Sequence, residues 1–171
     1  IVPYEPDHLL QIRQQPWQNG GNQTLEAAEV LTHGHCAFTA LCDKTGRALV
    51  CAGIVELWTN RAMCWSSIDI HARPVMLEAT RRTRLELDRA PFKRLEMYVI
   101  PGFVQAWRWA EMLGFQWEAF LECGSPDGRD MHVFKRIKRG RAARELSHGI
   151  RNVGPRRTEG RGVGHFRNGR E

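Results

Sequence analysis

The sequence predicts a mixed α/β domain, in which a mostly antiparallel sheet is flanked by helices, followed by a basic C-terminal segment. Two observations lead to this prediction. Residues 102–137 read as an amphipathic helix that ends at Gly114, a strand, a polar turn at 125–128 and a second strand. After Ile137 the composition changes, with seven glycines and ten basic residues in 138–171. We therefore predict a folded domain over 1–137 and a basic arm over 138–171.

The first part of the chain predicts short elements. Val2–Tyr4 is expected as an edge strand, and a helix to Gln14 is expected to begin at Pro6, with the Asp7 carboxylate as its cap. Thr24 is expected to cap a second helix that runs to Leu31. Three strands joined by turns at 43–46 and Asn60 follow as an antiparallel meander: 36–42, 48–57 and 63–70.

A long charged helix over 73–89 and an aliphatic strand over 93–100 come next. Pro74 stands in the first turn of the helix, where a missing amide costs nothing. The helix is expected to bury Met76, Ala79, Thr83 and Leu87 and to carry i,i+4 ion pairs at Glu78/Arg82, Arg82/Glu86 and Arg84/Asp88. Arg81, Arg82 and Arg84 could form a face that binds anions or nucleic acid, but a solvent-exposed helix surface is the favoured interpretation.

Charge is unevenly distributed. Residues 138–171 hold ten basic and three acidic residues, a net of +7, whereas the whole chain is +6 and residues 1–137 are therefore at −1. The five cysteines are scattered and odd in number, which indicates reduced thiols. No apolar run approaches the length of a membrane span and no secretory signal is visible, so we expect a soluble protein that is not exported by that route.

The order of these elements resembles the GCN5-related N-acetyltransferase (GNAT) superfamily over about residues 1–137. The most specific part is Ala106–Phe115, whose A-W-R-W-A-E-M-L-G-F resembles the late helix of the superfamily. Glu118 and the P-D-G-R-D turn before His132 resemble the branch that acetylates ribosomal proteins and antibiotics. The resemblance implies a GNAT fold, in whose active members acetyl-CoA is held where a strand gives way to the long helix.

The cofactor turn departs from the superfamily pattern. Its members present backbone amides to the diphosphate through a Gln/Arg-x-x-Gly-x-Gly/Ala turn, in which glycine lets the backbone approach phosphate. The corresponding segment here, Ile68–Met76, holds no glycine, and Pro74 removes one amide. We therefore expect no cofactor; in an active enzyme, acetyl-CoA would be bound near His71 and Arg73.

The late helix departs as well. Many members carry an Asn near its start and a Tyr that protonates the leaving thiolate, whereas the aligned positions here are Phe103 and Ala110. If the chain is active, a general base and an acid must come from the strands. The candidates are Glu56, Asp69 or Glu96 as base and Tyr98 as acid. A structural position is the favoured alternative for each.

Degenerate members that lose the cofactor turn occur among the internal virion proteins of short-tailed bacteriophages. The chain resembles that group in its aromatic strand at 63–65 and its Trp-containing late helix. This resemblance implies a virion protein, present in the host cytoplasm during assembly, that binds other virion proteins or itself and has no membrane partner. Trp107 and Trp109 lie about 200° apart around the helix, so either one meets a partner or both serve core packing.

The basic arm predicts contacts with polyanions or acidic surfaces. An arginine- and glycine-rich chain binds phosphate backbones through electrostatics with little sequence preference, and it can equally wrap an acidic protein surface. The arginines expected to make these contacts are Arg139, Arg141, Arg144, Arg151, Arg156, Arg157, Arg161, Arg167 and Arg170.

A metal site is not expected. His33, His35 and Cys36 form the only compact group of metal-ligand types, and neighbours on a strand point to opposite faces.

Three functions remain open on the sequence. The preferred one is a catalytically degenerate, phage-encoded structural protein that binds other particle proteins or packaged DNA. The alternatives are an acetyl-CoA-dependent N-acetyltransferase and a nucleic-acid-binding module driven by the arm.

Overall fold

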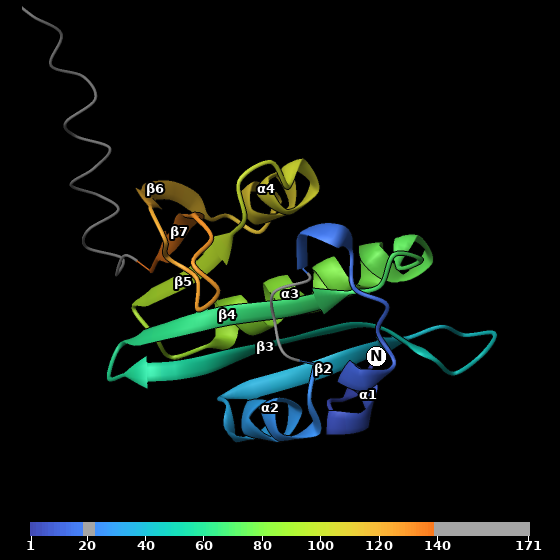
Figure 1. The fold of residues 1–171 in the computed structure, drawn as a ribbon. Helices are drawn as coiled ribbons and strands as arrows, with labels where there is room; N and C mark the ends of the chain where they lie inside the picture. Colours follow the sequence, from blue (N-terminus) through green and yellow to red (C-terminus); the bar gives the residue numbers. More distant parts are fainter. Residues whose placement is uncertain (19–22, 139–171) are drawn as a thin grey trace, which may run out of the picture. The chain divides into compact units, whose positions relative to one another are not determined.

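A computed structural model describes residues 1–18 and 23–138 (Figure 1). The first compact unit of the chain ends at Lys138. The nine arginines expected to bind partners, from Arg139 to Arg170, lie outside the described residues.

The elements are β1 (Val2–Pro3), α1 (Pro6–Leu10), α2 (Leu25–Val30), β2 (Cys36–Leu41), β3 (Ala48–Trp58), β4 (Arg61–Ile68), α3 (Met76–Arg89), β5 (Arg94–Val99), α4 (Val104–Met112), β6 (Gln116–Leu121) and β7 (Met131–Ile137). Short 3-10 turns cover Pro16–Gln18, Leu31–His33 and Arg73–Val75.

The strands of the described residues form one seven-stranded sheet in the order β1-β2-β3-β4-β5-β7-β6. Every neighbouring pair is antiparallel except β4 and β5, which are parallel. Helices α1 and α2 lie on one face of the sheet, and α3 and α4 lie on the other (Figure 1). The predicted mixed, mostly antiparallel sheet flanked by helices is confirmed.

Two apolar clusters hold these layers together. On one face Leu9 and Ala28 pack against Cys51 of β3. On the other face the larger cluster joins Leu87 of α3 and Trp109 of α4 to the sheet. β3 contributes to both clusters because its side chains alternate between the two faces of the sheet. Since both faces are covered, successive residues of this central strand are buried.

Most predicted boundaries agree with the structure to within two or three residues, but the first helix differs. It ends at Leu10, not Gln14, and Asp7 is not its cap. Glu5 is the N-cap instead, in a reciprocal capping box with His8. The predicted Thr24 cap is confirmed, since its side chain accepts from the amide of Ala27.

Both tryptophans of α4 serve packing. Trp109 is buried and donates from Nε1 to Thr80 Oγ1 at 2.9 Å, which ties α4 to α3. Trp107 is half-buried and stands edge-on against Phe134 and His132 of β7.

The ion pairs predicted along α3 are confirmed only at Arg82 and Glu86, whose charged atoms are 2.7 Å apart. Arg84 instead donates to the carbonyl of Met112, and Asp88 pairs with Arg136 of β7. Arg84 and Asp88 therefore bond to distant parts of the fold and not to each other. These contacts tie α3 to α4 and to the sheet.

Candidate functional site: the cleft between β4 and β5

The candidate site is the cleft that opens where the two parallel strands separate. β4 and β5 pair only from Arg61 to Met63, opposite Arg94 to Glu96. β4 continues to Ile68 and β5 to Val99 without pairing with each other, while β5 remains paired with β7 on its other side. Each strand therefore turns one backbone edge toward the gap.

A cavity of about 740 Å³ fills this gap. Apolar side chains from β4, β5, α3 and α4 form most of its wall: Ile68, Met76, Met97, Val99, Phe103, Ala106, Trp109 and Leu113. Polar groups come from the segment before α2 and from the β6–β7 turn: Gln14, Gln15, Gln18, Ser125, Asp127 and Arg129. A largely apolar cavity of this size with few polar groups is typical of a binding site.

Asp69 closes the connection between β4 and α3. Its side chain is buried, with 1% of the residue exposed, and forms an ion pair with Arg47. One carboxylate oxygen accepts from the amide of His71 at 2.8 Å, and the other accepts from the amide of Arg13 at 2.8 Å. A buried carboxylate is stable only with such partners, so Asp69 organises the turn around itself.

The backbone amides of residues 69–72, in the first part of this turn, are all engaged. Asp69 N donates to Leu49 O, Ile70 N to Arg13 O, His71 N to the Asp69 carboxylate and Ala72 N to Asp69 O. Pro74 has no amide to offer, and Val75 N donates back to Ala72 O. A diphosphate needs free N–H groups directed at it, and the amides of residues 69–72 offer none.

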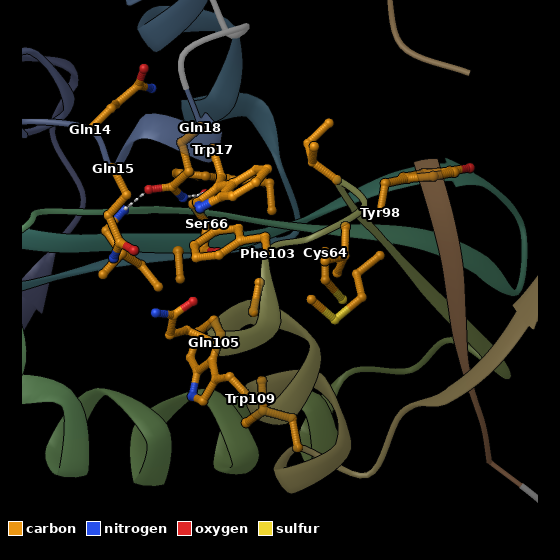
Figure 2. A pocket seen from close by; sticks show the side chains of 18 of the residues that line it. Gln14, Gln15, Trp17, Gln18, Cys64, Ser66, Tyr98, Phe103, Gln105 and Trp109 are labelled. Carbon is orange, nitrogen blue, oxygen red and sulfur yellow. Dashed lines mark hydrogen bonds between the residues drawn. The ribbon is translucent and has the colours of Figure 1, made fainter. Parts of the chain in front are cut away.

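Gln18 covers part of the free edge of β4. Its side-chain amide donates to Ser66 O and accepts from Ile68 N, both at 3.3 Å (Figure 2). A primary amide that donates and accepts on one strand edge makes the same pair of bonds as a neighbouring backbone. The chain thus places an amide of its own in the cleft.

Trp17 adds an aromatic cover beside Gln18. Its ring stacks on Phe103 with the ring centroids 6.4 Å apart and an interplanar angle of 16° (Figure 2). Gly102 permits this contact, because a Cβ at that position would lie 3.0 Å from the tryptophan ring. We call the segment Pro16–Gln18 the strap.

Of the candidate catalytic residues, the structure brings only Glu96 and Tyr98 together. Glu56 is exposed near the far end of β3 and does not line the cavity. Asp69 lines it, but its oxygens are committed to Arg47 and two amides. Tyr98 extends away from Trp17 and Phe103 in Figure 2, and its hydroxyl donates to Glu96 at 3.4 Å. Burial and the neighbouring Glu96 raise the pKa of Tyr98.

The candidate cofactor contacts are divided. Arg73 is exposed and lines the cavity, whereas His71 is exposed and does not. Cys64 also lines the cavity, but burial raises the pKa of its thiol to about 12, so it is protonated at neutral pH and a poor nucleophile.

Glu96, another candidate base, is buried and belongs to an ionic network across β4, β5, β6 and β7. Arg61 and Arg94 both bind its carboxylate, and Arg94 also binds Glu118, which pairs with Lys135. Burial opposes ionisation of Glu96, but the two arginines outweigh it and its pKa is lowered. An ionised carboxylate held by two guanidinium groups is a structural element and a poor proton acceptor.

Residues 1–18 and 23–138 offer neither a metal centre nor a membrane-spanning helix. No group of three or more His, Cys, Asp or Glu side chains there could hold a metal ion. His35 stacks edge-on with Phe92, and the His33 ring contacts Thr32. In the same residues each helix is too short or too polar to cross a bilayer.

Neither a protein-family model nor a curated protein sequence matches the chain. Solved structures do. Ard1 from Thermoplasma volcanium has a TM-score of 0.62 at 14% identity, over 81% of this chain and 96% of that one. An acetyltransferase of the GNAT family from Bacillus anthracis has a TM-score of 0.59 at 10% identity, over 80% and 93%. A putative phosphinothricin N-acetyltransferase has a TM-score of 0.59 at 14% identity, over 81% and 97%.

These similarities show that the chain has the GNAT acetyltransferase fold. The sequence resemblance anticipated this fold and the altered cofactor turn. It did not reveal the strap, because Trp17 and Gln18 carry no motif. Gln18 meets β4 about fifty positions along the chain, and Trp17 stacks on Phe103. The glutamine-rich stretch before the strap was the one available signal.

Proposed function

We propose that this protein is a non-catalytic member of the GNAT fold class that acts by binding other macromolecules, as a structural component of a bacteriophage particle. The binding role rests on the chemistry of the cleft. The virion role rests on the sequence resemblance to internal virion proteins of short-tailed phages.

The observation that carries the proposal is the closed turn at Asp69. The amides of residues 69–72 are engaged within the protein, and Pro74 follows with none. No glycine stands between Ile68 and Met76 to let backbone approach a phosphate. Binding the diphosphate through the amide of His71 would require breaking a contact of the Asp69 carboxylate, and leaving a buried carboxylate without partners is costly.

The late helix supports the same conclusion. Phe103 and Ala110 are both buried, so the helix presents apolar groups where the superfamily uses polar ones. The described groups around the cleft supply no thiolate-protonating acid at hydrogen-bonding distance from a free base.

Acetyl transfer is the second candidate, and one observation favours it. The cleft between β4 and β5 is open, with a cavity of about 740 Å³. In that case Tyr98 would be the acid and Arg73 would meet the cofactor.

A turnover assay separates the two candidates. The full chain is incubated with acetyl-CoA and a panel of amines, including spermidine, phosphinothricin and peptides with free N-termini, and thiol release is followed. We expect no release above the protein-free blank. Turnover that falls at least tenfold in Tyr98→Phe but not in the exposed Glu56→Gln variant would overturn the proposal.

The virion role has its own test. Mass spectrometry of purified particles from cells that express the gene should detect the protein at a copy number comparable with other particle proteins. Recovery only in the particle-free lysate would contradict that role without affecting the non-catalytic binding role.

A further inference from the structure

We infer that the cleft between β4 and β5 binds an extended segment of a partner polypeptide, which pairs with the free edge of β4 and takes the place of the Gln18 amide. The inference deepens the proposed binding role and rests on it.

The first step is the free strand edge. The ladder between β4 and β5 ends at Met63, so Cys64–Ile68 have no strand partner on that side among the described residues. Five residues of strand offer about 16 Å of edge. An unpaired edge of this kind is a template for another strand.

The second step is the amide already bound there. Gln18 bonds both to a carbonyl, Ser66 O, and to an amide, Ile68 N, on this edge. These are the two bonds that the N–H and the C=O of one residue of an incoming strand would make. The strap shows that the edge accepts an amide group, and its side-chain bonds are long enough, at 3.3 Å, to be exchanged for better ones.

The third step is the wall of the cavity. In Figure 2 the glutamines of the N-terminal segment lie on one side of the cleft, and Trp109 of α4 lies on the other. Because side chains of a strand alternate between faces, the occupant would be apolar at every second position, toward Met76, Ala106 and Trp109, and polar at the others.

The fourth step is charge. Asp69 is neutralised by Arg47, and Asp127 is paired with Arg129. Arg73 lines the cavity and has no ion pair within 1–18 and 23–138. A basic segment would be repelled, which disfavours the chain's own arm with its net +7 and favours a neutral or acidic segment of another protein.

The test uses the full chain and a blocked heptapeptide of alternating valine and threonine, followed by amide NMR. The main chain provides the bonds, so a generic sequence of the right alternation is expected to bind at millimolar or lower concentration. The amides of Cys64, Ser66 and Ile68 should shift on binding. A matched peptide with N-methyl groups on alternate amides keeps the side chains but loses the donors, and it should fail to shift these amides.

A variant gives the second readout. Gln18→Ala removes the competing amide and should tighten peptide binding roughly tenfold. Gln116 is an exposed glutamine of β6 that does not line the cavity, so Gln116→Ala should leave the affinity unchanged.

Three results would overturn the inference. The first is that the N-methylated peptide binds as tightly as the unmethylated heptapeptide. The second is that the heptapeptide shifts none of the β4 amides, either in the wild type or in Gln18→Ala. If in that second case CoA also shifts no amide, the peptide-binding inference is wrong while the proposed non-catalytic role stands. The third is micromolar binding of CoA or pantetheine with the same amide shifts, which would overturn the peptide site and the proposed function together.

Discussion

Asp69 is the residue on which the closed turn depends. Its buried carboxylate accepts from Arg13 N and His71 N and pairs with Arg47. Replacing it with Ala leaves those donors without an acceptor, so we predict a loss of about 3 kcal/mol in the free energy of unfolding. Asp69→Asn keeps one acceptor and should lose about half as much. Urea unfolding measures both, and a loss below about 0.5 kcal/mol for Asp69→Ala would contradict the central place given to this residue.

Gly102 makes room for Trp17. Its φ is +86°, and a Cβ there would meet the tryptophan ring at 3.0 Å. We predict that Gly102→Ala lowers the free energy of unfolding by about 1–2 kcal/mol and exposes Trp17, so that iodide quenches more of the tryptophan fluorescence.

Gly128→Ala is the matched control for this prediction. Gly128 also has a positive φ, +76°, but a Cβ added there would have nothing within 4 Å. This variant should be destabilised through its backbone alone, with quenching unchanged. Equal quenching in the two variants would show that Trp17 does not depend on Gly102.

At the scale of elements, the network across β4, β5, β6 and β7 should make stability depend on pH. Hydrogen bonds from Arg94 and Lys135 lower the pKa of Glu118 to about 2, from 4.5. A carboxylate with a lowered folded pKa stabilises the protein above its unfolded pKa, and this contribution is lost as the pH falls from about 4.5 toward 2. Because Glu118 is partly exposed, we expect a contribution on the order of 1 kcal/mol.

Urea midpoints between about pH 6 and pH 2.5 check this prediction. Glu118→Gln should lower the midpoint at the upper end of this range and flatten its decline below pH 4.5. Glu78→Gln, on the exposed side of α3, should follow the wild-type curve. If the Glu118→Gln curve kept the full wild-type slope below pH 4.5, the network would not contribute as described.

The elements themselves were largely predictable because their signals are local. Gly114 ends α4 with a φ of +84°, and Asn60 turns β3 into β4 with a φ of +70°, as the turn residues indicated. The start of α1 at Pro6 was predicted correctly, but its cap was not. Glu5 and Asp7 are both acidic residues near that start, and the reciprocal bonds of Glu5 and His8 prevail over Asp7.

The candidate site was predictable only in part, for a physical reason. The loss of glycine and the presence of Pro74 are visible in the sequence and indicated a defective cofactor turn. The partners that hold Asp69 in that turn come from distant parts of the sequence. Arg13 and Arg47, which both bond to the Asp69 carboxylate, lie 56 and 22 residues from it in the chain. No periodicity or spacing records such contacts.

For the whole molecule, the separation of charge predicts a salt-dependent interaction with DNA. The arm carries a net +7 while residues 1–137 carry −1. If about half of its ten basic residues meet phosphates, log K should fall with log salt with a slope of roughly −4. Fluorescence anisotropy with a DNA duplex between low and physiological salt measures this slope.

The control keeps the full chain and replaces Arg156, Arg157 and Arg161 with Gln. The slope should become shallower by about one to three. A slope near zero in the wild type, or one unchanged in the triple variant, would favour protein surfaces as the partners of the arm.

The most direct measurement of the central claim is calorimetric titration of the full chain with acetyl-CoA, because it requires no knowledge of an acceptor. With the amides at 69–72 engaged and no amide at Pro74, we predict no binding heat up to millimolar acetyl-CoA. A dissociation constant in the micromolar range would contradict the account, since it would mean that the turn around Asp69 opens to receive the cofactor.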